Sequence, residues 1–163
     1  ELKREGEKDR DDTPSIVMTP ESIVTHMDAF LTLEGTCPLL WESTGCFHRA
    51  GMFDPKTGAF IRLAEDIGRH NCIDRLAGWA CLNGVDPADT VLFLSARITA
   101  SLYAKARRAG FSFLISRSAV TSTPVEMARE QNRKHPAHPV TILGFCRPRE
   151  QRFTVFAGEG RIA

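Results

Sequence analysis

One stretch of the chain combines three carboxylates, an arginine, a histidine and an asparagine around a single glycine. It reads Glu65-Asp66-Ile67-Gly68-Arg69-His70-Asn71-Cys72-Ile73-Asp74, and an apolar helical pattern begins at once. The first turn of a helix presents free N–H groups and the positive end of the helix dipole, which suits a phosphorylated or polar ligand. A purely structural interpretation is equally open, in which Asn71 caps the helix and Asp66 pairs with Arg69 on the surface.

Three more polar clusters each follow an apolar segment that is typical of a strand. These clusters are Ser95-Ala96-Arg97-Ile98-Thr99, Ser116-Arg117-Ser118-Ala119-Val120-Thr121-Ser122 and Cys146-Arg147-Pro148-Arg149. Ligands of open α/β sheets bind beyond the carboxyl ends of the strands, where hydroxyl and N–H groups can hold a phosphate that an arginine neutralises. Helix capping alone also explains the serines and threonines, but it explains the arginines less well.

The predicted elements alternate between helices and strands, which favours a layered α/β domain with a sheet flanked by helices. Helices are expected from Thr19-Pro20 to near Gly35, after Asn71 to Asn83-Gly84, over 99–109 and over 124–132. The second of these is expected to bury Ile73, Leu76, Ala77, Ala80 and Cys81. Segments 48–53 and 59–63 predict a hairpin, 91–94, 111–115 and 140–145 predict buried strands, and 153–156 predicts an edge strand.

The composition and net charge of the chain limit the classes of protein to which it can belong. The chain has 163 residues, of which 42% are hydrophobic and 25% charged, and its net charge is +1. We therefore expect one soluble domain over 15–163, preceded by a flexible charged segment over 1–14, with no nucleic acid partner and no membrane span. Residue 1 is Glu rather than Met, which predicts a fragment or a processed chain.

The five cysteines predict reduced thiols in the cytoplasm, because their number is odd and no two form a C-x-x-C. Cys46 and His48 could form a nucleophile with its base, or two metal ligands facing one side of a strand. A buried structural cysteine is the more frequent case. The zinc deaminase pattern and the G-x-S-x-G pattern are both missing, so we expect no zinc and no metal site.

Several segments, in order and spacing from about Gly45 to the end, resemble one known family. Thr44-Gly45-Cys46-Phe47-His48-Arg49-Ala50 resembles T-G-x-x-H-x-A, and 65–76 resembles E-D-V-G-R-H-N-A-x-D-K-L. Segments 95–99, 118–122 and 143–148 and the final Arg161-Ile162 also fit, although Ala96 and Val120 depart from the pattern. The chain is similar to the FdhD/NarQ family of formate dehydrogenase accessory sulfurtransferases.

The resemblance implies a cytidine deaminase-like fold and a sulfur carrier. In this family a cysteine desulfurase loads a persulfide, and the sulfur passes to Mo-bis(molybdopterin guanine dinucleotide), the bound substrate, before that cofactor enters formate dehydrogenase. The resemblance also suggests a homodimer and GDP as a mimic of the cofactor. The persulfide cysteine of the family sits in a C-x-x-C loop upstream of the matched region, so none of the five cysteines here is assigned as the carrier.

The predicted cofactor site has two sources. The resemblance assigns Phe145, Cys146, Arg147, Pro148, Arg149 and Glu150. Polarity and position add Arg69, His70 and Arg97, and His70 could instead relay a proton, because imidazole titrates near neutral pH. Two alternatives remain open: a deaminase-like module that binds nucleotides without zinc, and a chaperone module that docks on a dehydrogenase.

Overall fold

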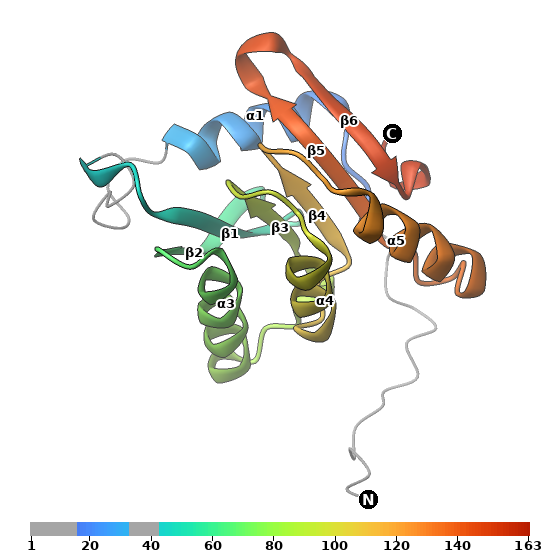
Figure 1. Cartoon of the computed structure of the whole chain (residues 1–163), viewed down its shortest axis with the longest axis horizontal. Coiled ribbons are helices and arrows are strands. Elements are labelled where there is room, and N and C mark those ends of the chain that lie inside the picture. The colour runs from blue at the N-terminus through green and yellow to red at the C-terminus, as the bar shows by residue number, and fades with distance from the viewer. Residues whose placement is uncertain (1–15, 33–42) are drawn as a thin grey trace, which may run out of the picture.

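A computed structural model describes residues 16–32 and 43–163 of the chain as one mixed sheet flanked by helices (Figure 1). The helices are α1 (Pro20–Thr32), α3 (Arg69–Asn83), α4 (Ala100–Arg108) and α5 (Ser122–Lys134). The strands are β1 (His48–Asp54), β2 (Ala59–Asp66), β3 (Val91–Leu94), β4 (Phe113–Ser116), β5 (Thr141–Arg147) and β6 (Arg152–Ala157). None of the described helices is long and apolar enough to cross a membrane.

The six strands lie in the order β2-β1-β3-β4-β5-β6. β3, β4 and β5 are parallel, whereas β1 is antiparallel to both of its neighbours and β6 is antiparallel to β5. β2 therefore runs in the same direction as β3, β4 and β5. All four strands end at one edge of the sheet, which we call the carboxyl edge. The first turns of α3, α4 and α5 lie at this edge because each helix follows one of these strands.

Two apolar cores fill the two faces of the sheet. Helices α3, α4 and α5 cover one face, where side chains such as Leu76, Leu102 and Ala128 pack against the strands. Helix α1 covers the other face with Ile23, Met27 and Phe30. The second core is rich in aromatic rings, and the centroids of Phe60 and Phe93 lie 5.2 Å apart in an edge-to-face arrangement.

A buried ion pair joins the β1–β2 hairpin to the end of α1. Arg49 Nε and Nη2 donate to Glu65 Oε1 at 2.9 and 2.7 Å, and Arg49 Nη1 donates to the carbonyl oxygen of Phe30 at 2.9 Å. The Arg49 and Glu65 side chains are only 4% and 2% exposed. The guanidinium therefore satisfies both the carboxylate and a carbonyl in the last turn of α1, which has no helical partner of its own.

A second buried arginine connects the two ends of the described chain. Arg161 Nε donates to the Ile16 carbonyl at 2.8 Å, and Nη1 donates to the carbonyls of Ser112 and Pro139 at 3.2 and 3.1 Å. Its guanidinium also lies 4.8 Å from the centre of the Phe113 ring. Met18 and Ile162 form a parallel bridge beside it, so the final residues complete the fold instead of trailing from it.

The structure confirms the main architecture that the sequence predicts. The hairpin around 54–58, the buried strand 91–94 and the edge strand near 153–156 are all present. Boundaries shift by about two residues, since α5 begins at Ser122 and β4 begins at Phe113. The predicted boundary at residue 14 and the predicted helix end near Gly35 lie outside the described residues. The cytidine deaminase-like fold stays a prediction.

Two details of the alternative structural interpretation of 65–74 are wrong, and so is one predicted buried residue. Gly68, not Asn71, is the N-cap of α3. Asp66 pairs with Arg75 at 2.9 Å and not with Arg69. Cys81 is exposed, while Cys72 takes a buried place on α3. The helix starts at Arg69, earlier than predicted. Its buried face contains Cys72 in place of Cys81.

We expect Arg49→Met to destabilise the fold by about 3–5 kcal/mol, because it leaves the Glu65 carboxylate buried without its partner. Urea unfolding followed by circular dichroism measures this loss. Arg75→Gln is the matched control: the Arg75 side chain is 63% exposed in its ion pair, so its loss should cost about 1 kcal/mol or less. Equal losses in the two variants would show that the buried pair has no special structural role.

Candidate functional site

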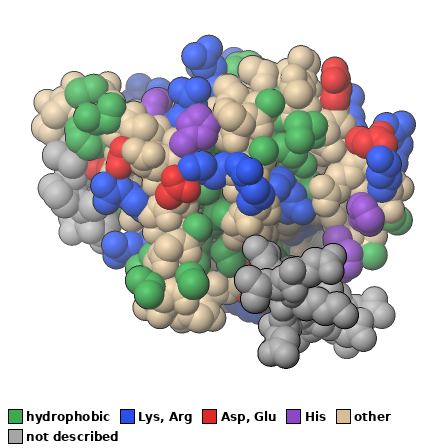
Figure 2. Space-filling model, turned by 60° about the horizontal axis from the view of Figure 1, so that its bottom comes forward, with side chains coloured by type: hydrophobic (Ala, Val, Ile, Leu, Met, Phe, Trp, Pro, Cys, Tyr) green, Lys and Arg blue, Asp and Glu red, His purple; other side chains and the backbone are tan. Residues whose placement is uncertain are grey.

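The carboxyl edge brings together the predicted site residues from four segments of the chain. Arg69 and His70 form the first turn of α3, Arg97 follows β3, and Phe145 to Glu150 lie at and beyond the end of β5. β1 begins at the same edge, because His48 is paired with Asp66. In Figure 2, Lys and Arg side chains gather in the middle of the visible face beside a histidine.

Asp66 organises the entry into α3. Its Oδ1 accepts hydrogen bonds from the Gly68 N–H at 2.9 Å and from Asn71 Nδ2 at 3.0 Å, and its Oδ2 accepts one from Arg75 Nε at 2.9 Å. These bonds, led by that from Gly68, lower the pKa of the Asp66 carboxyl. Asp66 thus stays ionised and structural. It fixes the start of α3 and so places Arg69 and His70.

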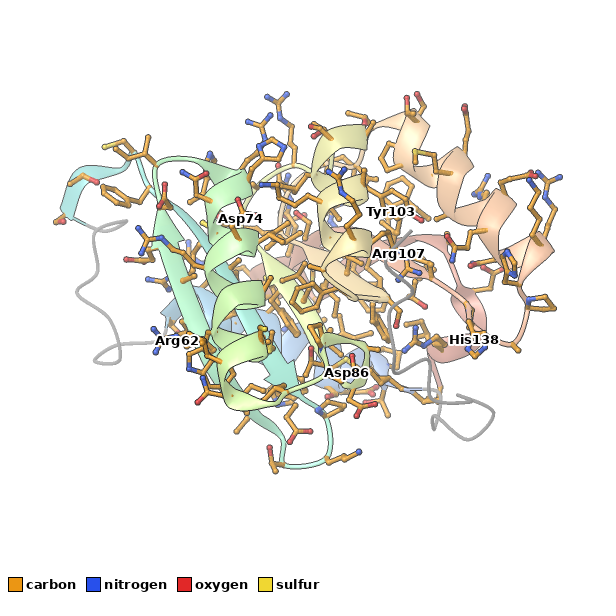
Figure 3. The ribbon with its side chains drawn as sticks, turned by 90° about the horizontal axis from the view of Figure 1, so that it is seen from below. Arg62, Asp74, Asp86, Tyr103, Arg107 and His138 are labelled. Atoms are coloured by element: carbon orange, nitrogen blue, oxygen red, sulfur yellow. The ribbon has the colours of Figure 1, made fainter. Side chains whose placement is uncertain are left out.

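Five side chains from three elements form a group that we call the histidine–arginine cluster: His48, Arg69, His70, Ser101 and Lys105. His70 Nε2 and Ser101 Oγ are 3.0 Å apart, and Ser101 Oγ lies 3.2 Å from Thr99 Oγ1. Lys105 forms an ion pair with Asp74, which Figure 3 labels on α3. The cluster therefore spans the start of β1, the first turn of α3 and helix α4.

The electrostatics of the cluster favour a negatively charged ligand. Partial burial, followed by the nearby charge of Arg69, lowers the pKa of His48. The same two causes and Lys105 lower the pKa of His70, against a weaker opposing effect of Asp74. Both imidazoles are therefore neutral at pH 7. Arg69 Nε is buried and has no hydrogen-bond partner among the described residues, so the cluster contains an unsatisfied donor.

The hydroxyls after β3 and β4 mostly serve the fold. Ser95 Oγ accepts the Arg49 N–H at 2.9 Å, and Ser116 Oγ donates to the Ala96 carbonyl at 2.8 Å. Thr99 caps α4 by accepting the Leu102 N–H. The arginines differ, because Arg97 and Arg117 are exposed and neither makes an ion pair within the part of the chain that the structure describes. Capping therefore accounts for these hydroxyls but leaves the two guanidinium groups facing solvent.

The end of β5 is irregular at the predicted cofactor segment. Phe145 has a φ of 49°, which is rare for a residue other than glycine, and its N–H donates to the Ser118 carbonyl at 2.9 Å. Gly144 is tightly enclosed, since a Cβ there would lie 2.6 Å from Val120 Cγ2. Residues held in such conformations often occur at functional sites. Arg147 lies just beyond, with its guanidinium 6.0 Å from the centre of the Phe145 ring.

Two residues of this segment, Cys146 and Pro148, point their side chains into the protein, and the assignment of the segment to the cofactor site stays a prediction. Cys146 is fully buried in the core beneath α1, and burial raises the pKa of its thiol to about 12. Pro148 is buried in the short 3-10 turn Pro148–Glu150. Arg147, Arg149 and Glu150 remain exposed. Arg149 and Pro148 also line a shallow groove of about 350 Å³ against α1, together with Val24, Thr25, Asp28 and Gln151.

The four cysteines that the structure describes form no assembled reaction centre. Cys72 is buried and donates through Sγ to the His48 carbonyl, and burial raises the pKa of its thiol to about 12. A thiol with so high a pKa is a poor nucleophile and metal ligand at neutral pH. Cys46 is exposed and precedes β1, so the shared strand face predicted for Cys46 and His48 is wrong. Cys37 lies outside the described residues. Within those residues, no three His, Cys, Asp or Glu side chains gather as a metal site.

Comparison with known proteins decides the family. The chain matches the model of the FdhD/NarQ family over residues 2–163. It belongs to the FdhD/NarQ family. Proteins named sulfur carrier protein FdhD from Streptomyces avermitilis and Bacillus subtilis are 34% and 33% identical, over 94% and 90% of the chain and 50% of each relative. The chain thus spans about half the length of these curated relatives.

A solved structure has the same fold. The crystal structure of a Desulfotalea psychrophila protein, described as a formate dehydrogenase accessory protein, superimposes with a TM-score of 0.75. The match covers 91% of this chain and 60% of that one, at 23% sequence identity. At this level of identity the likeness supports the fold alone. The mixed α/β architecture with a flanked sheet is therefore shared with an accessory protein of this kind.

Sequence reasoning missed some members of the site. Ser101 and Lys105 were not candidates, because they lie 31 residues from their partners on α3 and only the packing of α4 brings them close. His48 was noted only as the neighbour of Cys46. Its own signal was present, because a histidine at the start of the first hairpin strand must lie beside the end of the second.

We expect the stability of the fold to fall as the pH is lowered below about 6.5. The pKa values of His48 and His70 are lowered from 6.5, so the unfolded chain takes up protons first and gains stability relative to the folded one. The stability that the two neutral histidines contribute is fully present above pH 6.5. It is lost as the pH falls from 6.5 to their pKa values in the folded chain. Thermal melts from pH 5 to 8 measure this slope.

The double variant His48→Gln/His70→Gln should flatten this part of the pH profile. His138→Gln is the control for removing a histidine, because His138 is exposed and lies at the opposite edge of the sheet (Figure 3). An unchanged slope in the double variant would assign the pH dependence to other groups.

Proposed function

We propose that this chain is the cofactor-binding part of a sulfur carrier protein that serves formate dehydrogenase. In this proposal a cysteine desulfurase loads sulfur as a persulfide on a cysteine upstream of the chain. The sulfur then passes to the metal of Mo-bis(molybdopterin guanine dinucleotide), which is the substrate. The carrier is proposed to act in the cytoplasm and as a homodimer. Membership of the FdhD/NarQ family and the names of the relatives support this role.

The carboxyl edge supplies the physical support. The substrate bears two pyrophosphate groups, and guanidinium groups bind phosphate through paired, charge-assisted hydrogen bonds. Arg97 and Arg117 are exposed at this edge without an ion pair among the described residues. Arg147 is 47% exposed, and its separation of 3.9 Å from Glu150 makes only a loose pair. These cations can therefore turn toward a ligand with little competition from carboxylates.

The observation that carries the proposal is the position of Arg147. The irregular end of β5, with Phe145 at positive φ, places its guanidinium at the carboxyl edge and near an aromatic ring. A partly exposed aromatic ring beside an arginine offers a guanine base a stacking surface and its phosphate a counter-charge. In this assignment the chain binds and orients the nucleotide end, while the reacting sulfur comes from the upstream loop.

We expect the chain to bind GDP and not cytidine in a calorimetric titration. Arg147→Ala should weaken GDP binding by about 1.5–3 kcal/mol, because it removes a charge-assisted contact to phosphate. Arg133→Ala is the matched control, since Arg133 is exposed on α5 near the other edge of the sheet. Unchanged affinity in Arg147→Ala would remove this residue from the site. No binding of GDP by the wild-type chain would contradict the placement of the nucleotide site.

We also expect Cys46→Ser, made in the intact protein, to leave the persulfide loadable, because the carrier cysteine is proposed to lie upstream. Cyanide-releasable sulfur, measured after incubation with a cysteine desulfurase and cysteine, should stay at the wild-type level. Cys81→Ser, which removes another exposed thiol, is the control. Loss of the releasable sulfur in Cys46→Ser alone would show that the carrier thiol lies in this chain.

A further inference from the structure

The histidine–arginine cluster holds more positive charge than the surrounding carboxylates balance. Lys105 is paired with Asp74, and Asp66 is occupied by Gly68, Asn71 and Arg75. No described carboxylate pairs with Arg69, whose Nε is buried without a hydrogen-bond partner. After partial burial, the nearby charge of Arg69 is the next cause that lowers the pKa of His48 and of His70. A guanidinium near two imidazoles, with no carboxylate partner among the described residues, favours an anion as its ligand.

We propose that this cluster binds the pyrophosphate of the guanine nucleotide and takes up a proton on His70 as it does so. The proposal deepens the proposed function and rests on it for the identity of the ligand. Its geometric basis is independent, because the cluster comes from β1, α3 and α4 and shares no residue with the β5 segment.

The hydrogen bonds of His70 show how a proton would serve binding. His70 Nε2 lies 3.0 Å from Ser101 Oγ, and Ser101 is exposed in the first turn of α4. A protonated His70 donates through Nε2 to the serine oxygen, which leaves the serine O–H free to donate to a phosphate oxygen. Thr99 Oγ1, 3.2 Å from the same oxygen, is the alternative partner of that hydroxyl when no ligand is bound.

The charges around His70 determine the direction of the effect. Arg69 and Lys105 face it and oppose its protonation, while Asp74 favours it. A bound dianion adds negative charge and offsets the two cations, so the imidazole becomes easier to protonate in the complex than in the free chain. By linkage, the ligand binds more tightly at lower pH and is released as the pH rises.

Sulfate is the first probe, because it stays a dianion between pH 5 and 8 and so contributes no proton of its own. We expect its affinity to fall by up to about tenfold per pH unit between the free and bound pKa values of His70. The histidine ring signals, followed by NMR with and without sulfate, should show that the pKa of His70 rises in the complex. His70→Gln should make the sulfate affinity nearly independent of pH, and His138→Gln should leave it as in the wild type.

GDP and guanosine then separate the phosphate from the base. Calorimetry at pH 7 in two buffers of different ionisation enthalpy counts the protons taken up. GDP and pyrophosphate also titrate near pH 7, so the proton on His70 is counted as the difference between the wild type and His70→Gln. We expect this difference to be an uptake with GDP and with pyrophosphate, and to be absent with guanosine. Full proton uptake by His70→Gln, or sulfate binding that does not change with pH in the wild type, would overturn the inference.

The two proposals fail in different ways. Binding of GDP that needs Arg147 but involves no proton uptake would leave the proposed function standing and remove the cluster from the site. If sulfate and pyrophosphate bind with proton uptake, but GDP binds no more tightly than pyrophosphate, the anion site would stand. The assignment of a nucleotide as its ligand would then be wrong. Protein that binds none of these probes would overturn both.

Discussion

The common direction of β2, β3, β4 and β5 is the constraint on which the rest of the structure depends. Because these strands end at one edge, every loop that leads from them begins there, and so do α3, α4 and α5. Three helix starts then aim their free N–H groups at the same region, which is favourable for anions and unfavourable for cations. The arginines at this edge are therefore held against local electrostatics, and a phosphate-bearing ligand would relieve that cost.

Buried arginines fix the frame that holds this edge in place. Arg49 ties the hairpin to the last turn of α1, and Arg161 ties the final turn to the start of the described chain and to the loop before β5. Both use carbonyl oxygens as acceptors, so each guanidinium joins segments that are distant in sequence. Burial lowers the pKa of Arg161 to about 10, yet it remains protonated at neutral pH. The buried arginines thus hold the fold together, whereas the exposed arginines at the carboxyl edge have no such structural role.

The sequence predicts features that depend on a few neighbouring residues. It does not predict features that depend on packing between residues far apart in the chain. The buried run 91–94 and the turn at 54–58 follow from local composition. The inward position of Cys146 does not, because strict alternation along β5 would place it on the face opposite Leu143. The irregular pairing between Gly144 and Arg147 shifts this pattern by one residue, and both side chains enter the core beneath α1.

The same irregularity links fold to function. A regular strand would carry Arg147 along the sheet, but the positive φ of Phe145 turns the chain at a point where Gly144 leaves no room for another side chain. Local strain of this kind costs of order 1–3 kcal/mol and persists only when surrounding contacts enforce it. Here the Phe145 N–H to Ser118 hydrogen bond and the enclosed Gly144 enforce it. The fold therefore maintains an unfavourable backbone next to the exposed guanidinium of Arg147, and this coincidence favours a binding role for the segment over a purely structural one.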